Sequence, residues 1–293
     1  MNSQRAYRIG MIYTVISAAA WSTAGLFTRS LALDPFSILL WRGLFGGMGL
    51  LAVLILFRGP QGLKDFARLG WAGWLYAAIS ATGMISMIVA LKLTSVAHVA
   101  IIYATVPFIA AGLGWLVLRD RPGRAAMLAS ALALVGAAIS VGLGHEGDLF
   151  GDILALVMTV TMGLLMVLGR RFPVIPTLAA AAASALIAAA VSLPFAATPM
   201  PTGGELLLLA GFGLANSSIG IAFFLLGSAR IRPVETALIG ALDAPLAPLW
   251  VWIAFAEVPG AATLLGGTVV LVAVIGHILH SAARVTAPPA APS

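Results

Sequence analysis

The second half of this chain repeats the first, and each half contains an odd number of apolar segments long enough to span a membrane. One constant offset aligns Ser80 with Ser217, Gly83 with Gly220, Ala110 with Ala247 and Trp115 with Trp252. A slightly larger offset aligns Gly10 with Gly151 and Arg29 with Arg170. Because five spans return the chain on the opposite side of the membrane, the second copy must enter the membrane with the opposite sense. Many secondary transporters build a central cavity and two alternating gates from such inverted repeats.

The composition indicates a membrane protein, because 61% of the 293 residues are apolar and only 9% are charged. A helix needs about 20 residues to cross about 30 Å of hydrocarbon. Ten segments satisfy this length, at residues 9–28, 36–57, 69–91, 97–118, 123–142, 149–169, 177–197, 205–227, 235–255 and 260–280. Lipid cannot satisfy the unpaired edges of an open sheet. We therefore predict an all-α polytopic membrane protein, with ten transmembrane helices in a 5+5 inverted repeat around a central cavity.

The formal charge of +6 does not indicate nucleic-acid binding, because the basic residues gather on one side of the predicted topology. With the N-terminus in the cytoplasm, thirteen of the sixteen lysines and arginines fall on the cytoplasmic side. This bias follows the positive-inside rule and predicts that both termini are cytoplasmic. The expected partners are membrane lipid, anionic at that surface, and a small-molecule substrate. The sequence leaves monomer and homodimer open.

The two copies divide the chain at a polar link. Residues 1–145 are the predicted first five-helix repeat, residues 146–285 the second, inverted repeat, and residues 286–293, rich in Ala and Pro, a disordered tail. The chain contains no cysteine and no H-E-x-x-H motif. We therefore predict no disulfide, no metal site and no cofactor.

Two charged side chains lie deep inside predicted spans, away from the span ends. Asp243 lies near the middle of the ninth span, where a charge is costly and indicates a function. It can sense a substrate ammonium group or carry a coupling proton, or else form a hydrogen bond that fixes a neighbouring bend. Arg42 lies toward the outer end of the second span. It can bind a substrate carboxylate or extend toward the membrane interface.

Aromatic and polar residues at similar depth extend the candidate site. Trp21, followed by Ser22, and Tyr103 can stack on an aromatic substrate, or can belong to the aromatic belt at the lipid interface. His98 lies at the start of the fourth span. It can act as a pH-sensitive gate residue, or it can form only a local hydrogen bond. Asn216 can line a wet cavity or bridge two helices.

Methionines in the third and sixth spans provide a flexible, polarizable surface that suits varied apolar ligands. They are Met84, Met87, Met158, Met162 and Met166, of which we assign Met84 and Met162 to the substrate site. The alternative is that methionines at this helical spacing only pack against neighbouring helices.

Prolines interrupt two spans that are repeat mates. Pro107 lies in the fourth span, and Pro245 and Pro248 lie in the ninth. A proline removes an intrahelical hydrogen bond and bends the helix. Bends at corresponding places suit a rocking gate, with a static bend as the alternative.

Several stretches resemble the drug/metabolite transporter superfamily, in its ten-helix EamA-type branch. They are Trp21-Ser22, Trp41-Arg42-Gly43, Ala90 through Pro107 to Arg119-Asp120-Arg121, Gly151-Asp152, and Ala237 through Pro245 to Glu257. Within the branch, the chain looks most like the YddG-type exporters of aromatic amino acids and methionine. The resemblance implies a central cavity between spans one to four and six to nine. It also implies export from the cytoplasm across a bacterial inner membrane.

These observations predict a secondary transporter or facilitator, and not an enzyme. The expected substrates are small amphipathic metabolites, in particular aromatic and other apolar amino acids (Phe, Trp, Tyr and Met), exported by alternating access. The chain has no Walker A sequence and no loop like a selectivity filter. Another metabolite class or a toxic cationic drug is the alternative substrate. An intramembrane enzyme would need two facing carboxylates, and only Asp243 is deep.

Overall fold

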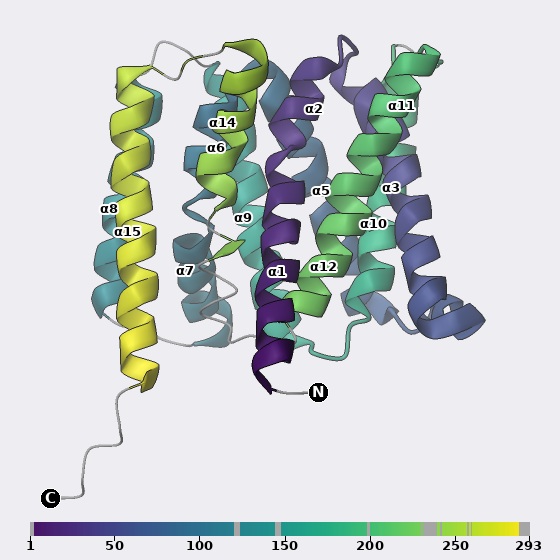
Figure 1. Ribbon diagram of the computed structural model, residues 1–293, viewed down its shortest axis with the longest axis horizontal. Coiled ribbons are helices and arrows are strands. Elements are labelled where there is room, and N and C mark those ends of the chain that lie inside the picture. The colour runs from purple at the N-terminus through teal and green to yellow at the C-terminus, as the bar shows by residue number, and fades with distance from the viewer. Residues whose placement is uncertain are drawn as a thin grey trace, which may run out of the picture.

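The computed structural model describes residues 3–119, 124–143, 148–197, 200–228, 230, 239–240, 242–256, 258 and 260–286. All the secondary structure within these residues is helical, and the long helices stand side by side in a bundle (Figure 1). In chain order the elements are α1 (Ser3–Ser22), α2 (Ala24–Ser30), α3 (Pro35–Arg58), η1 (Gly59–Leu63), α4 (Lys64–Ala67), α5 (Gly70–Leu93), α6 (Val96–Tyr103), α7 (Val106–Leu118), α8 (Arg124–Leu143), α9 (Leu149–Arg171), α10 (Thr177–Ser192), η2 (Leu193–Phe195), α11 (Gly203–Phe212), the π-helical segment η3 (Gly213–Ile219), α12 (Gly220–Ser228), α14 (Asp243–Phe255) and α15 (Ala261–Thr286).

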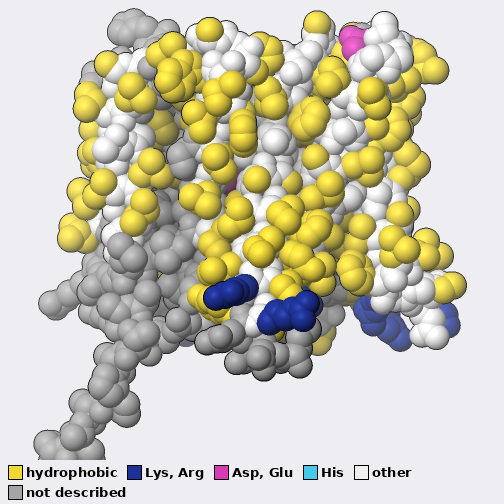
Figure 2. All heavy atoms as spheres, viewed as in Figure 1, with side chains coloured by type: hydrophobic (Ala, Val, Ile, Leu, Met, Phe, Trp, Pro, Cys, Tyr) yellow, Lys and Arg dark blue, Asp and Glu magenta, His cyan; other side chains and the backbone are white. Residues whose placement is uncertain are grey.

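The bundle is built to lie in a membrane. Among the described residues, six helical runs are long and apolar enough to cross a bilayer, or seven if the bent pair α6 and α7 counts as one span. Apolar side chains cover the flanks of the bundle in Figure 2, and lysines and arginines gather at the end where the N-terminus lies. Leu56 is 84% exposed and Leu207 76% exposed, which suits contact with lipid. The protein is thus a multi-pass membrane protein, and the ten-span arrangement stays a prediction.

Capping side chains explain where several helices begin. Asp34 precedes α3 and accepts hydrogen bonds from the backbone N–H groups of Phe36 and Ser37, both at 3.0 Å. Burial raises the pKa of the Asp34 carboxyl, but the hydrogen bonds outweigh burial and bring this pKa below its usual value. Thr202 and Glu205 form a capping box at the start of α11. These caps satisfy N–H groups that have no partner within the helix.

Helices from one half of the chain pack mainly on helices from the other. The principal pairs are α3 with α10, α5 with α9, α1 with α12 and α8 with α15. In the sequence repeat, α1 corresponds to α9, α3 to α10, α5 to α12 and α8 to α15. Exchanging each helix for its counterpart turns the α5–α9 pair into the α12–α1 pair. The α3–α10 and α8–α15 pairs stay as they are. This is the pairing that a two-fold relation between the halves would produce.

The helix boundaries recur at the same offset as the sequence repeat. Helices α7 and α14 each contain 13 residues, and their starts at Val106 and Asp243 are separated by the offset that aligns Ser80 with Ser217. Both end at a left-handed residue, Arg119 with φ of 57° and Ala256 with φ of 54°. A left-handed conformation is uncommon for residues other than glycine, so its recurrence at two corresponding positions supports the repeat. The starts of α8 and α15 are separated by the same offset.

Three spans are interrupted beside the centre of the bundle. Thr23 separates α1 from α2, and α6 and α7 are bent by 40° at a break before Pro107. Pro107 therefore lies in the first turn of α7, where a missing N–H costs nothing. Pro248 lies inside α14, and Pro245 in its first turn. The third interruption is the π-helical segment between α11 and α12.

Parts of the sequence predictions lie outside the described residues. They are the repeat boundary at 145/146, the motif residues Asp120, Arg121, Ala237 and Glu257, and the tail beyond Thr286. Thr286 itself, assigned to the tail, ends α15. The side chains of Pro107 and Pro245 also lie outside the described part of the structure.

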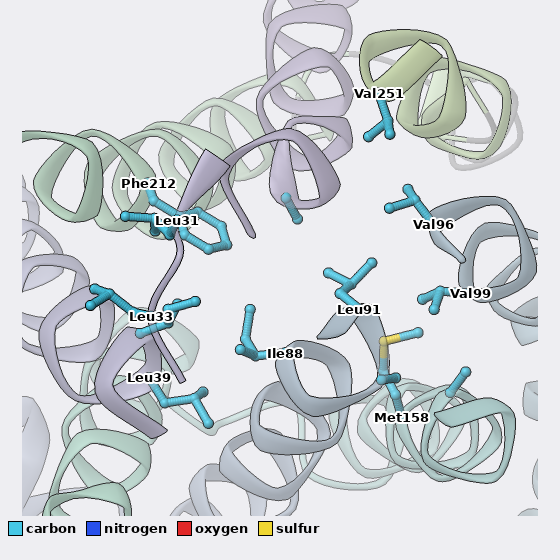
Figure 3. Packing of buried hydrophobic residues seen from close by; sticks show 14 of the residues in the cluster. Leu31, Leu33, Leu39, Ile88, Leu91, Val96, Val99, Met158, Phe212 and Val251 are labelled. Carbon is cyan, nitrogen blue, oxygen red and sulfur yellow. The ribbon is translucent and has the colours of Figure 1, made fainter. Parts of the chain in front are cut away.

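A buried apolar cluster occupies the end of the bundle opposite the N-terminus. Its members come from α2, α3, α5, α6, α9, α11 and α14 and from the link after α2. Figure 3 shows Leu91, Val99 and Met158 converging from three helices, while Phe212 lies beside Leu31. The cluster is well packed, since Ile38, Leu39 and Ile88 are 0% exposed.

Candidate substrate-binding site

A chamber of about 210 Å³ lies between the two halves of the bundle. Its walls come from α1, α2, α3, α5 and α6 on one side of the repeat boundary and from α9, η3, α12 and α14 on the other. The lining residues are Trp21, Ser22, Ala24, Gly25, Arg42, Ser80, Gly83, Met84, Met87, Leu91, Val96, Val99, Ala100, Tyr103, Met158, Met162, Asn216, Ser217, Ile221, Asp243 and Ala247. Leu91, Val96, Val99 and Met158 belong also to the apolar cluster, so this cluster borders the chamber.

Eight of the nine residues assigned from the sequence to a substrate site lie on the chamber wall: Trp21, Ser22, Arg42, Met84, Tyr103, Met162, Asn216 and Asp243. The ninth, His98, does not. Met87 and Met158 complete the methionine surface on α5 and α9, whereas Met166 is 50% exposed on the outside of the bundle.

Arg42 is buried in the chamber wall, with 3% of its surface exposed. Its Nη2 donates a hydrogen bond of 3.2 Å to Asn216 Oδ1. Its guanidinium lies 4.5 Å from the centre of the Phe212 ring, a cation–π contact. Arg42 therefore does not extend toward the membrane interface, which was one of the two interpretations of the sequence, because Phe212 and Asn216 hold it inside.

Asn216 connects this arginine to the first span. Its Nδ2 donates to the carbonyl oxygens of Ala20 at 3.0 Å and Trp21 at 3.2 Å. These carbonyls lie at the end of α1, just before the interruption at Thr23, and the Ala20 carbonyl also accepts from the Thr23 N–H and hydroxyl. The amide of Asn216 thus bridges two helices while bordering the chamber.

Ser22 also bridges helices at this interruption. Its hydroxyl accepts a hydrogen bond of 2.8 Å from Trp250 Nε1 and donates one of 2.8 Å to the carbonyl of Ala19. The indole of Trp250, on α14, therefore ties the ninth predicted span to the first. Ser22 is 1% exposed.

Asp243 brings a carboxylate to the opposite half of the chamber wall. It is the first residue of α14. Among the described residues it forms no ion pair, and Tyr103 on α6 lines the same chamber. A carboxylate at this place can bind a cationic group of a ligand or a proton.

His98 lies in a separate polar cluster next to the chamber. It is 0% exposed, and its Nδ1 lies 3.3 Å from both carboxylate oxygens of Asp152 on α9. Thr94 Oγ1 donates to Asp152 Oδ1 at 2.8 Å. The cluster links α5 and α6 to α9, so the structure places His98 beside the chamber and not on its wall, where the sequence assignment expected it. Local bonding of His98, the alternative, matches this arrangement.

Within the described ranges, no three His, Asp or Glu side chains lie close enough together to hold a metal ion. The side chains on the chamber wall include one guanidinium, one carboxylate, hydroxyl and amide groups, aromatic rings and thioethers.

The fold defines a multi-pass helical membrane protein with an internal chamber. Residues 8–142 are similar to the EamA-like transporter family. Members of this family are described as transporters.

One solved crystal structure, described only as that of a protein, resembles this chain at 24% sequence identity and a TM-score of 0.66. The match covers 97% of this chain and 99% of that one. At this identity the likeness concerns the fold alone, and it extends beyond residue 142 to nearly the whole chain. A comparison with curated proteins finds no match.

Proposed function

We propose that this protein is a secondary transporter that exports small amphipathic metabolites, in particular aromatic and other apolar amino acids, by alternating access. The observation that carries the proposal is the chamber, whose wall combines Arg42, Asp243 and a methionine surface from two halves of the bundle. An amino acid presents the complementary groups: a carboxylate, an ammonium group and an apolar side chain.

The methionine surface supports an apolar or aromatic substrate side chain. Met84, Met87, Met158 and Met162 face the chamber from α5 and α9. Unbranched thioethers adapt to different shapes and make favourable contacts with aromatic rings. Trp21 and Tyr103 add aromatic surface. One chamber with this wall suits Phe, Trp, Tyr and Met alike.

Alternating access is supported by the matched boundaries of α7 and α14 and by the pairing of α5–α9 with α12–α1. Two halves related in this way can rock about a central site and open it to each side in turn. The interruptions between α1 and α2 and between α6 and α7 border the chamber and provide places to bend. The proposal includes a 5+5 inverted repeat with both termini in the cytoplasm of a bacterium, and export across the inner membrane.

Counterflow into liposomes that contain the purified protein tests this function. Vesicles preloaded with unlabelled phenylalanine should take up labelled phenylalanine, and preloading with tryptophan, tyrosine or methionine should also drive uptake. Preloading with lysine or with a quaternary ammonium drug should not. Uptake driven by the drug and by no amino acid would replace the proposed substrate class with cationic drugs.

A further inference from the structure

The guanidinium of Arg42 has hydrogen-bonding capacity that the described protein does not use. Its Nη2 binds Asn216, but Nε and Nη1 are buried without a hydrogen-bond partner. These two nitrogens carry three N–H groups in the fixed plane of the guanidinium. Arg42 also forms no ion pair within the described part of the chain.

A buried guanidinium whose N–H groups lack partners favours the binding of an anion. Removing a guanidinium from water is costly, and an opposite charge with good hydrogen-bond geometry compensates for the cost. The stack on Phe212 covers one face of the guanidinium, and Arg42 also lines the chamber. A carboxylate can accept two parallel N–H bonds from a guanidinium, here the second N–H of Nη2 together with an N–H of Nε or of Nη1.

We infer that Arg42 forms the carboxylate subsite of the chamber and that Asn216 is the residue that positions it. This inference rests on the proposed function and specifies its substrate class: anions and zwitterions that carry a carboxylate next to an apolar body. The methionine surface on α5 and α9 receives the apolar body. A ligand without a negative charge leaves the three N–H groups of Nε and Nη1 unpaired.

Asn216 can position Arg42 because its own amide is held on the other side. Both N–H groups of Nδ2 are directed at the carbonyls of Ala20 and Trp21, which fixes Oδ1 toward Arg42 Nη2. A neutral amide orients the guanidinium without neutralising its charge. An aspartate at position 216 would itself pair with Arg42 and occupy the subsite.

The test compares two ligands that differ only in charge, 3-phenylpropionate and 3-phenylpropionamide, binding to the purified full-length protein in nanodiscs by isothermal titration calorimetry. For the unmodified protein we expect the carboxylate to bind at least about tenfold more tightly than the amide, since removing one partner of a buried charge pair has an effect of this size or larger. Equal affinities, or no binding of either ligand, would overturn the inference without any variant being made.

Variants then assign the effect to the two residues. Arg42→Gln should reduce the ratio of the two affinities to about one, about tenfold below the ratio of the unmodified protein. Asn216→Asp should have the same effect, because the new carboxylate would pair with Arg42. The ratio is informative because a general loss of packing would weaken both ligands together. Arg8→Gln, at an exposed arginine, is the matched control and should leave the ratio unchanged. A full ratio in both chamber variants would contradict the assignment.

The inference and the proposed function can fail separately. If phenylalanine shows no counterflow while 3-phenylpropionate binds in an Arg42-dependent manner, the carboxylate subsite stands and amino-acid export falls. If phenylalanine is exchanged with the same half-saturating concentration in Arg42→Gln, export stands and the subsite falls.

Discussion

The indole Nε1 of Trp21 donates a hydrogen bond of 2.9 Å to the backbone carbonyl of Asn216, in the π-helical segment η3. A second side chain from α1, Ser17, donates at 2.7 Å to the carbonyl of Gly220, directly after this segment. A π-helical turn departs from the regular hydrogen-bond ladder, and lipid offers no substitute partner. Donors from α1 therefore stabilise η3, and η3 in turn places the Asn216 side chain between Arg42 and the end of α1.

Replacing Trp21 with Phe should destabilise the protein, because the ring is retained but the Asn216 carbonyl loses its indole donor. We expect the free energy of unfolding to fall by about 1–3 kcal/mol, the cost of an unsatisfied buried group. Thermal unfolding of the detergent-solubilised protein measures the change. Trp71→Phe, at a tryptophan that is 70% exposed, is the control and should have little effect. Equal stability of Trp21→Phe and the unmodified protein would show that this bond does not support η3.

Gly220 should not tolerate alanine. A Cβ at this position would overlap the indole Nε1 of Trp21, and the Trp21–Asn216 bond would have to shift. We expect a loss of about 1–3 kcal/mol, as for other overpacked sites. Gly112→Ala in α7 is the matched control, because a Cβ there meets no atom within 4 Å. Comparing the melting temperatures of the two variants tests this, and similar values would mean that α12 moves away at little cost.

Substituting His98 should affect stability and not substrate recognition. His98→Ala removes the partner of Asp152 Oδ2 and leaves a cavity between α6 and α9. We expect a loss of about 2–5 kcal/mol, typical of a large buried side chain truncated to alanine. The half-saturating concentration for phenylalanine counterflow in the folded fraction should stay within about twofold, since a change of that size is under 0.5 kcal/mol. A tenfold increase with unchanged stability would instead return His98 to the substrate site.

Asp243→Asn tests whether the deep carboxylate couples transport to protons. Asparagine has similar shape but cannot take up or release a proton, so proton-driven phenylalanine flux should lose its dependence on pH while exchange flux persists. Flux would be measured in liposomes from pH 5.5 to about 8.5, a range chosen for titrating side chains near neutrality. Glu205→Gln changes an exposed capping carboxylate and is the control. An Asp243→Asn profile that follows the unmodified protein would exclude a coupling role.

Local sequence patterns predicted the helices well, because each span is a continuous apolar run. The expected start at residue 149 is the start of α9, and the expected start at 177 is the start of α10. Membership of the chamber wall also followed from depth, since polar residues in mid-span have few other places to face.

The interactions between distant residues could not be read from the sequence. Arg42 and Asn216 are 174 positions apart, and no local pattern sets their contact. The same holds for His98 and Asp152, because burial of the histidine depends on how closely α6 meets α9. Helix geometry explains why Met166 lies outside the chamber: over the eight residues from Met158, a helix with 3.6 residues per turn rotates by about 80°. That rotation moves Met166 from the chamber to the lipid-facing side.

In the proposed mechanism, one chamber binds the substrate and opens to each side of the membrane in turn. The chain has no cysteine, so a single cysteine gives no background labelling. Ala100→Cys places a thiol on the chamber wall, and Met166→Cys places one on the outer surface as a control. Labelling by a membrane-impermeant maleimide would be measured in right-side-out and inside-out vesicles, with and without phenylalanine. We expect the thiol at position 100 to react from both sides and phenylalanine to slow both reactions, while the control thiol is unaffected by phenylalanine. Reaction from one side only, or no protection by any proposed substrate, would contradict this mechanism.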